Sequence, residues 1–136
     1  MPVKVLDSWA LIAFFEDEPA AAQVEKLLLQ AEAGTHKLLL SVINWGEIYY
    51  NTMREVSQEA ADRLAINLAG LTIEIVGVDG KNLQLVRQAA IFKATRKLSY
   101  ADAFAAALAK LRNAELVTGD REFKLVGDEI KIAWLR

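Results

Sequence analysis

The chain has 136 residues, of which 54% are hydrophobic, 25% are charged and none is cysteine, and its formal net charge is −2. This length fits one domain, expected over residues 1–136, and the absence of cysteine excludes disulfides and thiolate chemistry. The charge argues against a protein that coats nucleic acid non-specifically, and no apolar run approaches the ~18 residues of a membrane span. Without a convincing signal peptide, we expect a cytoplasmic location and no membrane partner.

Strand-like and helix-like apolar periods alternate along the chain. In chain order the expected elements are strand 3–7, helix 9–15, helix 17–33, strand 37–42, helix 44–54, helix 57–70, strand 72–78, helix 79–95, helix 99–112, strand 114–120 and strand 130–135. Gly34 and Gly70 mark helix ends, whereas Ser57, Asp79 and Ser99 are expected helix caps. Alternation of this kind predicts βαβ units with right-handed crossovers. The predicted fold class is α/β, a three-layer α/β/α domain with a mostly parallel five-stranded sheet.

Two acids stand directly at the ends of expected strands. Asp7 closes the first strand and Asp120 closes the fourth. In open α/β sheets, ligands bind in the crevice beyond the carboxyl ends of the strands, and crossover rules readily bring these two strands side by side. For each acid alone the alternative is a helix cap, because aspartate commonly caps the helix that follows a strand.

Glu47 lies on a polar stripe of the helix after the second strand, with Asn44, Asn51 and Arg54 at spacings of three or four residues. Judged alone, this stripe is better explained as a solvated helix face. A helix that starts at the carboxyl end of a strand nevertheless places its first turns beside the same crevice. Glu47 is therefore a candidate partner of the strand-end acids.

The segment LSYADAFAAALAKLR (98–112) sets Asp102 into a helix of mainly apolar side chains. At ~100° per residue, Asp102 lines up with alanines, whereas Phe104 and Leu111 project from the opposite side toward a core. Asp102 and Ser99 also match a capping box, which explains the acid but not the alanine surface beside it. Such a surface would let the helix approach other backbone closely and hold Asp102 in a crowded place.

Carboxylates that converge in one crevice repel each other and resist ionisation, and a bound cation removes that difficulty. The available ligands are all oxygen, because the chain has no cysteine and one histidine, His36, before the second strand. Hard oxygen ligands favour Mg²⁺ or Mn²⁺ over Zn²⁺. His36 is poorly placed for Ser–His–Asp chemistry, and no glycine-rich phosphate loop is present. Metal-assisted hydrolysis of phosphodiesters is the chemistry that remains.

Four segments resemble the PIN-domain ribonucleases, especially the VapC-type toxins of prokaryotic toxin–antitoxin pairs. They are VLDSWALIAFF, SVINWGEIYY, LSYADAFAAALA and LVTGDREF, which together span residues 5–123. Each segment alone is weakly diagnostic, whereas all four in this order are strongly so. The resemblance implies a PIN-like fold and Mg²⁺-dependent endonucleolytic cleavage of RNA, and the all-oxygen ligands allow Mn²⁺ as a substitute. It further implies a homodimer and inhibition by a cognate antitoxin whose tail enters the active site.

The resemblance also assigns roles to residues of this chain. The acids that match the family's metal-binding and catalytic positions are Asp7, Glu47, Asp102 and Asp120. The supporting positions beside them are the hydroxyl residues Ser8 and Thr118 and the acid Glu122, which stands at a variable position of the family. Together the acids would hold one or two metal ions, with water as the nucleophile and no covalent intermediate.

The basic residues Lys93, Arg96 and Lys97 closely precede the Asp102 helix. They are candidates for contacts to RNA phosphates that flank the scissile bond. A solvated basic stretch at a helix end explains them equally well. Trp9 would be able to stack on a base, but core or dimer packing is the better explanation for it.

Two other functions remain open. A PIN-like fold without catalysis would serve as an interaction module, although all four acids are present. A phosphoacceptor receiver domain is also α/β with an acidic Mg²⁺ pocket, but it typically has an acidic doublet after the first strand and a lysine after the last. This chain has VLDSW (5–9) and IAWLR (132–136) instead, so the receiver ranks lower.

Overall fold

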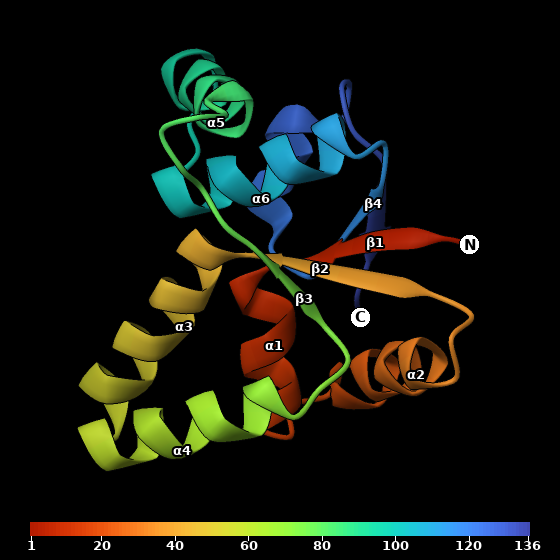
Figure 1. Cartoon of the computed structure of the whole chain (residues 1–136), viewed down its shortest axis with the longest axis vertical. Coiled ribbons are helices and arrows are strands. Elements are labelled where there is room, and N and C mark those ends of the chain that lie inside the picture. Colours follow the sequence, from red (N-terminus) through yellow and green to blue (C-terminus); the bar gives the residue numbers. More distant parts are fainter.

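The computed structural model describes residues 1–136 (Figure 1). Its strands are β1 (Val3–Leu6), β2 (Lys37–Ser41), β3 (Glu74–Val76), β4 (Glu115–Thr118) and β5 (Ile132–Trp134). Its α-helices are α1 (Ser8–Phe15), α2 (Ala21–Glu32), α3 (Val42–Glu55), α4 (Gln58–Ala69), α5 (Gln84–Thr95) and α6 (Tyr100–Leu111). A 3₁₀ helix, η1 (Arg121–Val126), connects β4 to β5. No helix combines the length and the apolar character needed to cross a bilayer.

The sheet has the order β3-β2-β1-β4-β5, and every neighbouring pair of strands is parallel. β1 lies at the centre, where Leu6 pairs with Leu40 of β2 and with Val117 of β4. The chain adds β2 and β3 on one side of β1 and then returns to add β4 and β5 on the other. The carboxyl ends of β1 and β4 therefore meet where the strand order reverses, the place where such sheets form ligand crevices.

Figure 1 shows α5 and α6 on one face of the sheet and α1 and α2 on the other. Successive side chains of a strand point to opposite faces, so each central strand supplies both cores. The core with α5 and α6 contains Val5, Leu39 and Leu116. The core with α1 and α2 contains their chain neighbours Leu6, Leu40 and Val117. The predicted α/β class and five-stranded parallel sheet are confirmed.

The helix α6 is buried on nearly all sides. Its residues from Ala103 to Ala109 are all buried, and the helix contacts α3, α5, η1, β1, β2 and β4. Alanine side chains end at Cβ, which allows this close approach to several neighbours at once. Leu111, expected to face the core, is instead 44% exposed, because α6 ends there and the chain turns away at Asn113 with a φ of 49°.

Element boundaries agree in part with prediction. Ser57 and Ser99 cap α4 and α6, and each hydroxyl oxygen accepts from the amide three residues later. Asp79 does not cap α5, which begins only at Gln84, because its carboxylate accepts from two amides of the intervening loop and forms a turn. α2 also begins later than predicted, since Asp17 has a φ of 52°, outside the helical region. The edge strands β3 and β5 are shorter than predicted, with three residues each.

Candidate active site

Asp7 follows β1 and caps α1. One of its carboxylate oxygens accepts from the backbone amide of Ala10 at 2.9 Å, and the other accepts from the Thr118 hydroxyl. The second bond agrees with the parallel register of β1 and β4, in which Leu6 and Val117, the residues just before Asp7 and Thr118, are paired. Burial raises the pKa of Asp7 to about 7, and the charges of Asp102 and Asp120 add to the rise. The predicted helix cap is present, but Asp7 also faces other acids.

Thr118 links Asp7 to Asp120 across the strand ends. It is the last residue of β4 and is fully buried. Its hydroxyl donates to Asp7 and accepts from the backbone amide of Asp120 at 3.0 Å. Asp120 in turn caps η1, where its carboxylate accepts from the backbone amide of Glu122 at 3.0 Å. The turn between β4 and η1 is thus fixed against β1 by side-chain hydrogen bonds.

Asp102 lies in the first turn of α6. Its backbone amide donates to the Ser99 hydroxyl at 3.1 Å, which is one half of the predicted capping box. The pKa of Asp102 is raised to about 7, and burial is the largest cause. The negative charges of Asp120, Glu47 and Glu122 raise it further, whereas a hydrogen bond with Ser99 lowers it. An acid that served only as a cap would not be surrounded by three others. Asp102 therefore lies with Asp7 and Asp120 in one group of acids, which we call the acidic crevice because it stands where the strand order reverses.

Glu47 reaches this crevice from α3. It is partly buried and accepts a hydrogen bond from the hydroxyl of Ser8, the first residue of α1. Of the polar stripe around it, Asn44 is fully buried, whereas Asn51 accepts a hydrogen bond from the exposed Arg54. The stripe is therefore not uniformly solvated, because its first turn faces the interior of the molecule.

Three acids, Asp102, Asp120 and Glu122, each offer one carboxylate oxygen that lies within 4.8 Å of the other two. Glu122, predicted only in a supporting place, belongs to this group, while Asp7 and Glu47 lie around it. The charges that shift the pKa values of Asp7 and Asp102 are all negative. An all-oxygen donor set without a balancing positive charge fits a hard divalent cation, which would offset the repulsion.

The sequence did not single out Gly119, which stands between Thr118 and Asp120. A Cβ atom at Gly119 would lie 2.2 Å from the Trp9 ring, closer than atoms approach without displacement. Trp9 is partly buried and packs against the core with α1 and α2, in agreement with the preferred core role. Trp9 thus covers the backbone of the turn that carries Asp120, and only glycine leaves room for it.

The three predicted RNA contacts differ in their surroundings. Arg96 forms ion pairs with Asp128 at 3.3 Å and with Glu129 at 2.5 Å. The Lys93 amine donates to the backbone carbonyl five residues later at 2.9 Å, and Lys97 is exposed. Arg96 therefore has a structural role in fixing the loop after η1 to the end of α5, and contacts of all three residues to RNA stay a prediction.

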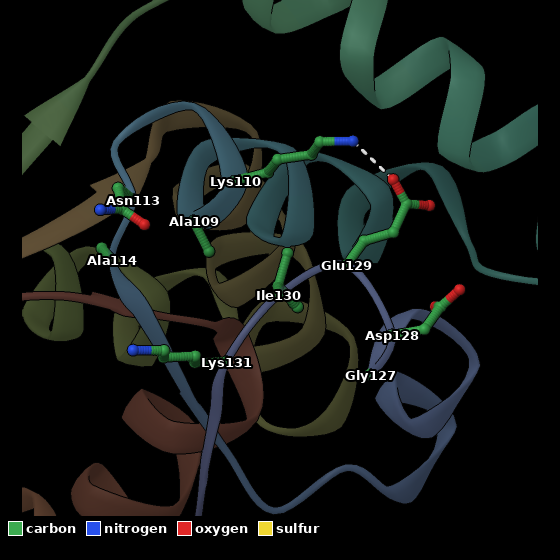
Figure 2. A pocket seen from close by; sticks show the side chains of 9 residues that line it. All are labelled: Ala109, Lys110, Asn113, Ala114, Gly127, Asp128, Glu129, Ile130 and Lys131. Atoms are coloured by element: carbon green, nitrogen blue, oxygen red, sulfur yellow. Dashed lines mark hydrogen bonds and ion pairs between the residues drawn. The ribbon is translucent and has the colours of Figure 1, made fainter.

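A cavity of about 330 Å³ lies at the C-terminal end of α6 (Figure 2). Its lining consists of Ala109, Lys110, Asn113, Ala114, Gly127, Asp128, Glu129, Ile130 and Lys131. None of the predicted site residues lines it, and Lys110 is about two helical turns from Asp102. Figure 2 shows the ion pair of Lys110 and Glu129 across its rim. The cavity and the acidic crevice are separate features of the molecule.

Solved structures share the fold of this chain. A chain of VapBC2 from Rickettsia felis, bound to a DNA fragment from its promoter, has a TM-score of 0.73 at 17% identity, over 98% of this chain and 99% of that chain. DNA-bound VapBC from Salmonella typhimurium has a TM-score of 0.73 at 18% identity, over 98% of each chain. VapC20 of Mycobacterium tuberculosis, a sarcin-ricin loop cleaving toxin, has a TM-score of 0.68 at 18% identity, over 91% of this chain and 95% of that chain.

Sequence comparison gives the family. No curated protein is significantly similar to the chain in sequence. The sequence profile described as PIN domain, however, matches residues 4–129, which include all of the acids discussed above. This match favours the predicted resemblance over a receiver domain. The chain belongs to the PIN domain family.

Proposed function

We propose that the chain is a Mg²⁺-dependent endoribonuclease, with Mn²⁺ as a substitute, and the toxin of a VapBC-type toxin–antitoxin pair. One observation carries the proposal. Acids from four separate segments of the chain meet at the strand-order reversal, where burial and mutual repulsion raise the pKa values of Asp7 and Asp102 to about 7. Acidic side chains without a basic partner therefore lie close together at the place where α/β sheets bind ligands.

The acids Asp102, Asp120 and Glu122 would hold the cation, with Asp7 and Glu47 beside them. When bound, a divalent cation supplies a Lewis acid that polarises a phosphoryl oxygen and makes water a better nucleophile. The protein's own part is to deliver these carboxylates deprotonated and in fixed orientations. Metal binding should therefore release protons near neutral pH, where the acids are partly protonated without it.

RNA is the proposed substrate, with Lys97 and Lys93 as phosphate contacts at the N-terminal side of α6. The sarcin-ricin loop cleaving activity of the similar VapC20 supports this choice. The similar VapBC structures support a cognate antitoxin as the protein partner. We further propose a cytoplasmic homodimer with one PIN-like domain per chain. Tyr50 and Met53, which are 47% and 46% exposed on α3, offer apolar surface to such a protein partner.

Cleavage of end-labelled RNA by the purified protein tests the proposal. The reaction is run with Mg²⁺, with Mn²⁺ and with EDTA, and the Asp102→Asn protein is prepared in parallel. Cleavage that needs the metal and disappears with Asp102→Asn is the expected result. Equal cleavage by both proteins would point to a contaminating nuclease or another site.

A binding measurement covers the case in which neither protein cleaves the RNA offered. Mn²⁺ titration of the wild-type protein by calorimetry asks whether the crevice binds a cation at all. Binding without cleavage of any RNA would favour the non-catalytic interaction module. Absence of both would contradict the proposal.

A further inference from the structure

We infer that Asn44 is a positioning residue of the acidic crevice, which sets the place of Glu47 relative to Asp102. The inference rests on the proposed function, because the spacing of these two acids matters only if the crevice binds a cation. Asn44 lies in the first turn of α3, one turn before Glu47, and is fully buried. Residues one turn apart share a helix face, so Asn44 lies beneath Glu47 on the side of the crevice.

The Asn44 side chain joins three helices through one nitrogen atom. Nδ2 donates to Ser8 Oγ in α1 at 3.4 Å and to the carbonyl oxygen of Ala101 in α6 at 3.1 Å. The Ser8 hydroxyl in turn donates to the Glu47 carboxylate. The residue after Ala101 is Asp102. Asn44 is thus connected to Glu47 through the Ser8 hydroxyl and to Asp102 through the backbone carbonyl of Ala101.

The orientation of the Asn44 amide follows from its partners. A backbone carbonyl can only accept a hydrogen bond, so the nitrogen must point toward Ala101. Oδ1 is buried and accepts no hydrogen bond from another protein atom. A buried acceptor without a donor is costly and rare, and an apolar side chain of similar size would avoid that cost. Packing alone therefore does not explain an asparagine here.

The same arrangement directs the Ser8 hydroxyl. Its oxygen accepts from Asn44, and its single hydrogen is left to donate to Glu47. The backbone carbonyl oxygen of Asn44 is a second acceptor within reach of Ser8 Oγ, at 3.3 Å. That carbonyl is present whatever the side chain at position 44. Without the Asn44 amide, the hydroxyl is free to turn to this carbonyl, and Glu47 loses the bond that orients it.

The test is the affinity of the full chain for Mn²⁺, measured by calorimetry together with the melting temperature of the metal-free protein. Asn44→Ala should weaken Mn²⁺ binding about tenfold, as expected for groups that orient metal ligands. Asn51→Ala is the matched control, because it removes the same side chain from the same helix two turns later, and it should change the affinity by less than about twofold. Ser8→Ala removes only the middle link and should also weaken binding, which keeps the test decisive if Asn44→Ala does not fold.

The same substitution in a Glu47→Gln protein distinguishes a loss of Glu47 positioning from a general loss of structural order. In a Glu47→Gln protein, the acid that Asn44 positions is already lost, so adding Asn44→Ala should weaken Mn²⁺ binding by less than about twofold. An equal loss in both backgrounds overturns the inference. So does an unchanged affinity of Asn44→Ala, even where its melting temperature falls. If the wild-type protein binds no Mn²⁺, the proposed function fails and the inference fails with it.

Discussion

The two ends of α6 carry charged clusters of opposite design. At its N-terminal end, every charge that shifts the pKa of Asp102 belongs to another acid, and with burial these charges raise that pKa to about 7. At its C-terminal end, Glu129 pairs with Lys110 and Arg96, and the hydrogen bond from Lys110 is the main cause of a lowered pKa. The second cluster balances its own charge and ties a loop in place. The first has no balancing positive charge of its own, and this is the physical basis for proposing a cation site there.

Removing one acid from each cluster should give the largest contrast. Asp102→Asn should lower metal-dependent RNA cleavage by more than about 100-fold, because direct ligands matter more than the groups that orient them. Glu129→Gln should leave cleavage within about twofold, since surface pairs contribute little. Initial rates on one labelled RNA measure both. Comparable losses in the two variants would erase the distinction between the clusters.

The pH dependence of stability should expose the unbalanced cluster without any RNA. Asp7 binds protons more tightly when folded, with a pKa of about 7 against an ordinary value of 3.8, so its contribution is full below pH ~4 and is lost as the pH rises through about 7. Without metal, the free energy of unfolding should fall by on the order of 3 kcal/mol between about pH 5 and pH 8.

Urea denaturation across this range measures the effect, with and without saturating Mg²⁺. The cation should remove most of the fall, because it stabilises the ionised acids. Glu129→Gln should keep the same pH profile as the wild-type protein. A free energy of unfolding that rises with pH in the metal-free protein would show that Asp7 does not bind protons more tightly in the folded state.

Much of this organisation was predictable from the sequence. The alternation of apolar periods predicted the parallel sheet, and the acids at strand ends pointed to the edge of the sheet where the structure gathers the acids. Ser99 was recognisable as a cap because its partner is only three residues away. Local signals did fail at Asp79, where the side chain forms a turn instead of a cap.

The remaining features depend on contacts between residues far apart in the chain. The hydrogen bond from Asn44 to Ala101 and the contact of Trp9 with Gly119 arise only when α1, α3, α6 and the turn after β4 are packed together. The ion pairs of Arg96 join residues more than 30 positions apart. No local sequence pattern predicts such contacts between distant residues. The roles of Asn44, Trp9 and Arg96 were therefore ambiguous in the sequence.

The packing of the acidic end offers a smaller effect. Gly119→Ala should destabilise the protein by about 2 kcal/mol, because the new methyl group would overlap the Trp9 ring. Trp9→Phe shortens the ring at that point, so the double variant should lose less stability than the sum of the two single changes. Urea denaturation of the three variants gives the coupling. Strict additivity would mean that the ring does not constrain the turn.

The balanced cluster should show the smallest effect. Glu129→Gln should lower the melting temperature by less than about 5 °C in dilute buffer. The difference should shrink in about 0.5 M NaCl, since salt screens exposed pairs. Differential scanning calorimetry at the two salt concentrations measures it. A large fall in melting temperature that does not depend on salt would show that this cluster contributes more to stability than an exposed ion pair does.

Anomalous diffraction from crystals grown with Mn²⁺ would show whether the acidic crevice binds a cation, because it locates the ion without assuming any activity. We expect a peak between the carboxylates of Asp102 and Asp120, with Glu122 or the neighbouring acids completing the oxygen ligands. The same crystals of Asp102→Asn should lose that peak. A wild-type crystal whose Mn²⁺ peaks avoid the crevice, or lie at Asp128 and Glu129 instead, would contradict the claim that the unbalanced acids form a metal site.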